Sequence, residues 1–201
     1  MFVQVIRGKV ADAGALRAAL DRWMRDLSPG ATGWLGSTSG VTDDGTAIAF
    51  ARFSSREAAQ RNSERAEQHQ WWMETAKLFA GEVTFHDCDD AMTWLEGGRD
   101  DAGFVQVMTG RISDPQRVRK LFEADTATLR AFRPDIIGSV IAVAPDQTYA
   151  EAVYFTSEAE AREGERKEMP PEIKAQYEDM MALIQDVTFH DLHHLWMHSP
   201  T

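Results

Sequence analysis

The tetrapeptide Phe2-Val3-Gln4-Val5 recurs as Phe104-Val105-Gln106-Val107, 102 residues further along the chain. At the same spacing Gly36-Ser37 recurs as Gly138-Ser139, so the register holds without a gap. Near the end of each copy Val83-Thr84-Phe85-His86-Asp87 recurs as Val187-Thr188-Phe189-His190-Asp191, now at a spacing of 104 residues. Self-similarity at a fixed period marks a repeated structural unit, so these identities indicate a tandem duplication.

Each copy predicts the element order β-α-β-β-α-β. Asp12 and Ser55 are suited to cap the two helical regions of the first copy. We expect the second region to break in two, near Glu67-Gln68 in the first copy and at Pro170-Pro171 in the second. The opening strands and the hairpins are expected at residues 2–9, 34–40 with 46–53, 104–111, and 136–143 with 148–155.

This order predicts an α+β fold of two tandem ferredoxin-like units, residues 1–98 and 103–201, joined by the linker Gly97-Gly98-Arg99-Asp100-Asp101. Each unit would carry its helices on one face of an antiparallel sheet. The other face is rich in valine and phenylalanine and should not stay exposed to water. We therefore expect the two sheets to pack together into an intramolecular, pseudo-dimeric α+β barrel.

The composition narrows the choice of partners and compartment. The chain of 201 residues has a net charge of −11, which argues against nucleic acid and anionic membranes as partners. Cys88 is the only cysteine, so neither an intrachain disulfide nor a thiolate zinc cluster is expected. Since neither a signal peptide nor an apolar run of about 20 residues is evident, we expect a cytoplasmic protein.

The pattern resembles the antibiotic-biosynthesis-monooxygenase-like (ABM) domains of the dimeric α+β barrel superfamily. The resemblance rests on the opening strands and on Arg52-Phe53-Ser54-Ser55-Arg56-Glu57-Ala58-Ala59 with its counterpart at residues 154–161, where an aromatic strand end runs into a capped helix. It implies a ligand pocket between helices and sheet. Members of the family include cofactor-independent oxygenases of aromatic polyketides or quinols, and haem-degrading oxygenases.

The haem-degrading branch can be compared position by position. It uses an Asn at the end of the first strand, a Trp on the second helix and a His further along that helix. None of these residues is found at the matching positions, so haem binding and degradation are disfavoured. His69 lies two residues from the expected ligand position, and a shift in the helix register would bring it there. The matching positions are Arg7, Asn62 and Trp71 in the first copy, and Thr109, Gly164 and Ala175 in the second.

The stretch His69-Gln70-Trp71-Trp72 is the first candidate site. An indole beside an imidazole can line an aromatic pocket and exchange a proton near neutral pH. Alternatively Trp72 is part of the core, while His69 and Trp71 lie on the helix surface. Consecutive helical residues point about 100° apart, so at most one of the two tryptophans faces the pocket squarely.

Small side chains at Ala47, Ala49 and Ala51 alternate along the third strand of the first copy and share one face of the sheet. Their counterparts in the second copy, which include Tyr149 and Glu151, are larger. Bulky residues opposite the alanines either fill the space or line a cavity. If only one copy keeps a pocket, we expect it to be the first. The expected lining residues are Trp23, Trp34, Ala49, Ala51, Trp71, Trp72 and Phe79.

Histidines recur at matched positions and gather at the end of the chain. His86 and His190 lie at the ends of the fourth strands. They serve either as structural hydrogen-bonding groups or as members of two equivalent functional sites. The final segment adds His193, His194 and His198, and imidazole suits zinc, copper or nickel. We favour an arm whose Leu195-Trp196 packs against the other half, with Met92-Thr93-Trp94-Leu95 doing the same in return, and we expect no metal.

The leading hypothesis is a protein that binds a small apolar or aromatic molecule and oxidises it without a cofactor. In such chemistry the substrate supplies the electrons, while the protein binds it, removes a proton and excludes water. His69, or His86 if it reaches the pocket, would be the base. The alternative is a non-catalytic ligand-binding or scaffold protein with a filled pocket. A monomeric pseudo-dimer or a weak homodimer is expected.

Overall fold

The computed structural model describes residues 1–95, 97–123 and 126–200, which fold into two compact units. The first unit comprises Met1–Ala91 and Asp191–Thr201, and the second Met92–His190. Elements of the first repeat, in chain order, are β1 (Phe2–Lys9), α1 (Ala13–Asp26), β2 (Trp34–Val41), β3 (Thr46–Phe53), α2 (Arg56–Ser63), α3 (Ala66–Thr75), β4 (Thr84–Cys88) and β5 (Asp90–Leu95).

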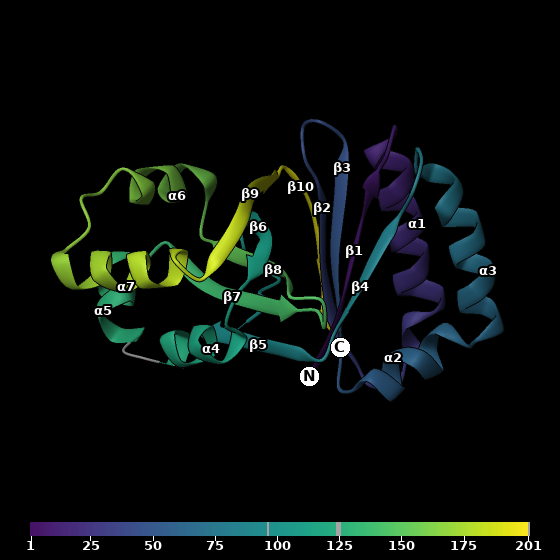
Figure 1. Ribbon diagram of the computed structural model, residues 1–201. Coiled ribbons are helices and arrows are strands. Elements are labelled where there is room, and N and C mark those ends of the chain that lie inside the picture. The colour runs from purple at the N-terminus through teal and green to yellow at the C-terminus, as the bar shows by residue number, and fades with distance from the viewer. Residues whose placement is uncertain (96, 124–125, 201) are drawn as a thin grey trace. The chain divides into compact units, whose positions relative to one another are not determined.

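The second repeat follows the same order (Figure 1). At the place of α1, the structure describes the helices α4 and α5, one on each side of residues 124–125. The elements of the second repeat are β6 (Phe104–Ile112), α4 (Pro115–Glu123), α5 (Thr126–Phe132), β7 (Ile136–Val143), β8 (Thr148–Phe155), α6 (Glu158–Glu165), α7 (Pro171–Met181), β9 (Ile184–Leu192) and β10 (His194–His198).

Each unit contains a five-stranded sheet, in the orders β10-β2-β3-β1-β4 and β5-β7-β8-β6-β9. The fifth strand of each sheet comes from the other repeat, since β10 pairs antiparallel with β2 and β5 lies beside β7. The predicted exchange of terminal arms is thus confirmed, and Trp196 on β10 is buried beside Leu16 and Val41. A side-chain Cβ at Gly40 would lie 2.8 Å from the Cβ of Leu192 and 2.9 Å from the backbone oxygen of His194 at the start of β10, so this close approach requires glycine.

Local sequence signals account for the helix starts. The side chain of Asp12 accepts a hydrogen bond from the backbone of Ala15, and Ser55 and Ser157 cap α2 and α6 in the same way. The break in the first repeat falls earlier than expected, because α2 ends at Ser63 and α3 begins at Ala66. In the second repeat α7 begins at Pro171, as expected for proline in the first helical turn.

The α+β class and the two ferredoxin-like units are confirmed by this topology. Closure of the two sheets into a single barrel stays a prediction. Among the described residues, the helices are too short or too polar for any of them to cross a bilayer.

Candidate functional site

The space between helices and sheet in the first unit is almost full. A cavity of about 50 Å³ remains, at the meeting of Ile6 and Ala49 on the sheet with Trp71, Trp72 and Phe79. This is little more than the volume of one or two water molecules. The alanines of β3 do leave room, and the aromatic side chains opposite occupy it.

Those aromatic rings form a continuous packed series. The ring centroids of Trp23 and Trp34 are 5.1 Å apart, those of Trp23 and Trp71 are 6.5 Å apart, and those of Trp71 and Trp72 are 6.4 Å apart. The indole nitrogen of Trp71 donates to the backbone oxygen of Ala19 at 2.9 Å, and that of Trp23 donates to the side chain of Gln68 at 2.6 Å. Close packing of inclined rings, with the N–H groups of Trp23 and Trp71 hydrogen-bonded, is typical of a structural core.

Neither predicted catalytic histidine is among the residues that line this cavity. His69 is exposed on α3. His86 pairs with Val5 across the sheet, while the neighbouring Phe85 pairs with Ile6, which lines the cavity. Because successive strand residues point to opposite faces, His86 lies on the face turned away from the helices.

The predicted lining residues divide into two groups. Ala49, Trp71, Trp72 and Phe79 meet at the small cavity. Trp23 and Trp34 do not line that cavity; they are buried in the adjoining apolar cluster beside Phe2 and Phe53, against which Ala51 and Trp71 also pack.

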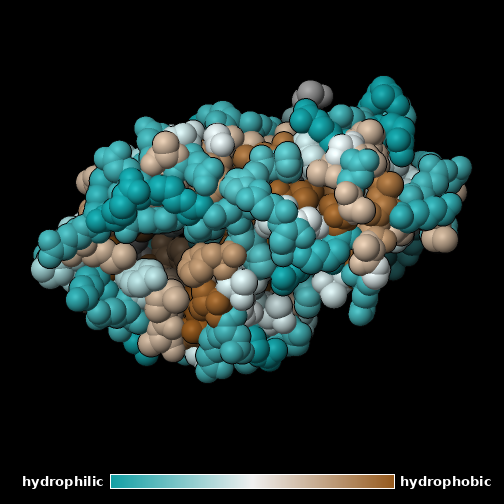
Figure 2. Space-filling model, turned by 90° about the horizontal axis from the view of Figure 1, so that it is seen from above, coloured by the Kyte–Doolittle hydropathy of each residue, from teal (hydrophilic) through white to brown (hydrophobic). Residues whose placement is uncertain are grey.

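The larger cavity lies in the second unit, where it measures about 290 Å³. This corrects the expectation that the first copy would keep the pocket. In the space-filling view, apolar side chains surround a hollow on the surface of the second unit (Figure 2). Aromatic and methionine side chains dominate the lining: Trp94, Met108, Phe122, Phe132, Met169, Tyr177, Met180, Met181 and Phe189.

Residues at matching positions of the two repeats explain why the cavity of the second unit is larger than that of the first. Trp34 of the first copy corresponds to Ile136 in the second, which removes an indole from the cavity wall. On α3 the wall includes the two indoles of Trp71 and Trp72, whereas α7 contains no tryptophan, and its part of the wall consists of Ile173, Gln176, Tyr177, Met180 and Met181. Larger residues on β8 do not compensate for this loss of volume.

The floor of the large cavity carries an acidic and a hydroxyl side chain. Glu151 pairs with Met108 on β6 and with Ile141 on β7, while Ser139 pairs with Val153. Residues 139, 141, 151 and 153 therefore share the sheet face that the helices cover. Glu151 and Ser139 are only 5% and 1% exposed, and both line the cavity.

Burial sets the electrostatics of this floor. The low-dielectric surroundings raise the pKa of Glu151, and the hydrogen bond from Tyr149 and the nearby Ser139 hydroxyl only partly offset that effect. The Tyr149 hydroxyl donates to Glu151, and burial with the neighbouring carboxylate raises the pKa of Tyr149 well above its usual range. The Ser139 hydroxyl makes no hydrogen bond of normal geometry with the described residues, so it is available to a ligand.

Arg133, another residue of the lining, forms an ion pair with Asp135. The guanidinium of Arg133 binds the carboxylate of Asp135 through Nε at 3.0 Å and through Nη2 at 2.6 Å. Both side chains are largely buried, at 13% and 5% exposure. This bidentate pair is electrically neutral as a whole and orders the segment between α5 and β7.

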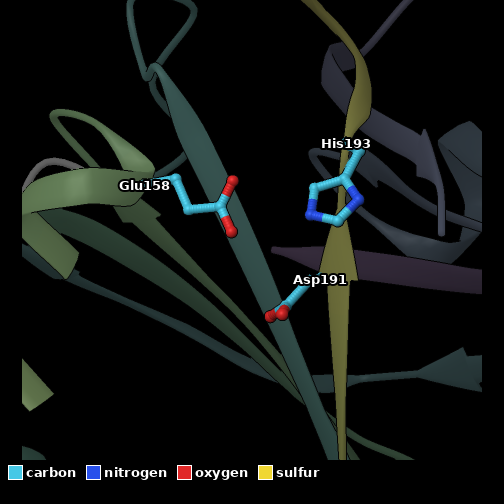
Figure 3. A group of neighbouring side chains, drawn as sticks. All are labelled: Glu158, Asp191 and His193. Atoms are coloured by element: carbon cyan, nitrogen blue, oxygen red, sulfur yellow. The ribbon is translucent and has the colours of Figure 1, made fainter. Parts of the chain in front are cut away.

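The histidine-rich end of the chain forms strand β10. Figure 3 shows Asp191 and His193 beside the start of that strand, together with Glu158 at the first turn of α6. Glu158 belongs to the second unit and the other two residues to the first. Within either unit taken alone, the described residues contain no group of three His, Cys, Asp or Glu side chains near enough to share a metal ion. The side chain of His193 contacts Asp43 at 2.6 Å.

Glu151 is the residue that sequence reasoning passed over as a functional group. Its signal was available, because a single acid between Ala150 and Ala152 interrupts an otherwise apolar strand. Acidic residues are seldom buried without a partner, so such an interruption is itself informative.

Comparison with solved structures supports the fold. A proposed monooxygenase from Fusobacterium nucleatum aligns with a TM-score of 0.75 and 9% identity, over 98% of this chain and 94% of that protein. A proposed monooxygenase from Lactobacillus acidophilus gives 0.72 and 14%, over 98% and 95%. An anthrone oxidase-like protein gives 0.61 and 13%, over 98% and 93%.

These likenesses support the α+β fold of two tandem ferredoxin-like units that the repeat predicted. No protein-family model matches the sequence, and neither does any curated protein.

Proposed function

We propose that the second unit binds a small, mostly apolar aromatic molecule in the cavity between its helices and its sheet. The cavity of about 290 Å³ carries this proposal, since it lies at the lower end of the volumes that small-molecule sites occupy. Its lining is also of the expected kind, with many aromatic and thioether groups and few polar ones. Tyr177 and Phe189, which are 46% and 54% exposed, stand where the cavity meets solvent.

The polar floor gives the ligand an orientation. An apolar body would lie among the helices, with its polar group directed to Glu151 and Ser139. A ligand that lacks such a group would leave the Ser139 hydroxyl without a partner, at a cost of about 1–3 kcal/mol for a buried polar group. The site should therefore discriminate between ligands of equal size by their polar end.

Cofactor-independent oxygenation is a second candidate function. The ionised carboxyl of Glu151 could accept a proton from an activated C–H₂ group, and its raised pKa brings it closer to that of a useful base. The resulting carbanion would reduce O₂. One oxygen atom would become the oxygen of the new C=O group, and the other would leave as water together with the two hydrogens of the original C–H₂ group. The fold shared with proposed monooxygenases favours this candidate.

Binding and chemistry can be tested separately. The purified chain would be titrated with anthrone, naphthol and naphthylmethyl compounds while the quenching of tryptophan fluorescence is followed. Oxygen uptake would then be recorded with those that bind. Saturable binding supports the main proposal, and its absence for all of these compounds contradicts it. Oxygen uptake that falls by roughly 10²-fold or more in Glu151→Gln would support the oxygenase.

A further inference from the structure

The floor of the large cavity holds an acid that has no basic partner. Glu151 is 5% exposed, and hydroxyl groups are what it contacts: Tyr149 donates to it, and Ser139 lies beside it. No basic side chain of the described residues contributes to the shift of its pKa. A buried carboxylate in this position therefore lacks a countercharge, which is an unfavourable state in a protein interior.

Arg133, the one basic side chain that lines the cavity among the described residues, does not supply that countercharge. Arg133 is held by Asp135 in the bidentate pair, and its Nη2 also points to the backbone oxygen of Ala161 at 3.5 Å. Its guanidinium stacks over Phe155, 5.8 Å from the ring centroid. The lining as a whole therefore carries one uncompensated negative charge when Glu151 is ionised.

The walls suit a cation as well as an apolar body. Trp94, Phe122, Phe132 and Tyr177 present aromatic rings to the cavity, and such rings attract a desolvated ammonium group. Methionines such as Met108 and Met180 offer polarisable surfaces that adapt to irregular ligands.

We infer that the ligand of the second unit is a lipophilic amine, a small aromatic molecule whose protonated nitrogen pairs with Glu151. This inference rests on the proposed function only in that the cavity must bind a ligand. It also separates the two candidate functions, because a carboxylate neutralised by a ligand cation is no longer an effective base.

The inference is tested with three ligands of nearly equal shape: 1-naphthylmethylamine, 1-naphthylmethanol and 1-methylnaphthalene. The amine is a cation near pH 7.5. The alcohol is neutral but can form hydrogen bonds, and the hydrocarbon is apolar. Calorimetry on the full chain at about 0.15 M salt should show the amine binding about 10–100-fold more tightly than the alcohol, the range expected for a charged hydrogen bond.

Two variants identify the charge that is responsible. Glu151→Gln keeps the size of the side chain and should remove the advantage of the amine, while the affinity for the alcohol changes less than about 3-fold. Glu163→Gln removes one charge from the exposed surface of α6 and should leave all three affinities unchanged. This control matters because the net charge of −11 attracts any cation weakly.

The outcomes are distinct. Equal affinities for the amine and the alcohol, or an advantage of the amine that survives in Glu151→Gln, would overturn the inference while leaving the cavity as a binding site. Failure of all three ligands to bind would overturn the proposed function as well. Oxygen uptake with a neutral ligand, dependent on Glu151, would overturn the amine in favour of the oxygenase.

Discussion

Glu151 and its counterpart Ala49 show how a difference at one position can give two copies of a repeat different interiors. Both lie on the third strand of their copy and face the helices. At Ala49 the small side chain makes room for tryptophans, whereas Glu151 brings a carboxyl group into an apolar space. The chemical difference between the two halves is therefore concentrated at this position.

The raised pKa of Glu151 has a consequence for stability. Because the folded protein binds this proton more tightly than the unfolded chain, the free energy of unfolding should fall as the pH rises from the ordinary value of 4.5 to the raised pKa, and level off above it. Urea denaturation at a series of pH values would measure this. The difference between Glu151→Gln and the unmodified chain should grow over that interval. A difference that does not vary with pH would contradict the burial of an ionisable group here.

At the scale of elements, the repeat made most of the fold predictable. Alternating apolar strands and capped helices are local signals, so β1, β3, β7, β8 and the helix starts follow from them directly. The break between α2 and α3 was misplaced by a few residues because no proline marks it, as Pro170-Pro171 does in the second repeat. Helix ends without proline or glycine depend on tertiary packing.

The position of the cavity was not predictable from one strand. The alanines of β3 suggested free space, but a cavity is the difference between two layers and depends on both. Bulky residues opposite the alanines were recognised as able to fill that space, and Trp72 is one that lines the small remaining cavity. The wall of the second unit, which includes Ile173, Gln176 and Met180, gave no comparable signal, because branched and flexible side chains do not show from sequence how much volume they leave.

The exchanged strand β10 should contribute strongly to the stability of the first unit. Trp196 is 5% exposed, so Trp196→Ala should lower the free energy of unfolding by about 3–5 kcal/mol. His194→Ala, at the exposed first residue of the same strand, should change it by less than about 0.5 kcal/mol. Chemical denaturation followed by tryptophan fluorescence and circular dichroism would compare them. Equal effects of the two substitutions would count against the packing of β10 on this core.

Ile6 and Met108 occupy the same position in the two repeats, and each lines the cavity of its own unit. Ile6→Trp adds volume to a filled space and should cost about 1–3 kcal/mol of stability. Met108→Trp adds a similar volume to a space of about 290 Å³ and should cost less than 1 kcal/mol, as a rough bound. Thermal denaturation of both variants would check this, and the reverse order of stabilities would show that the cavities had been assigned to the wrong units.

At the scale of the whole molecule, the duplication has given two units of one topology with different interiors. One is filled by its own tryptophans, and the other keeps a cavity with a buried acid on its floor. We expect the chain to bind one ligand molecule rather than two, because about 50 Å³ does not admit an aromatic ring. The first unit would then serve as scaffold and the second as binding unit.

The most direct test of this account is the stoichiometry of ligand binding, measured by calorimetry with an aromatic ligand on three proteins. The unmodified chain and Ile6→Trp should each bind one molecule per chain. Met108→Trp should lose at least about 10-fold in affinity while remaining folded, because the new indole occupies the site. Two molecules per chain, or undiminished binding in Met108→Trp, would contradict the claim that the cavity of the second unit is the functional site.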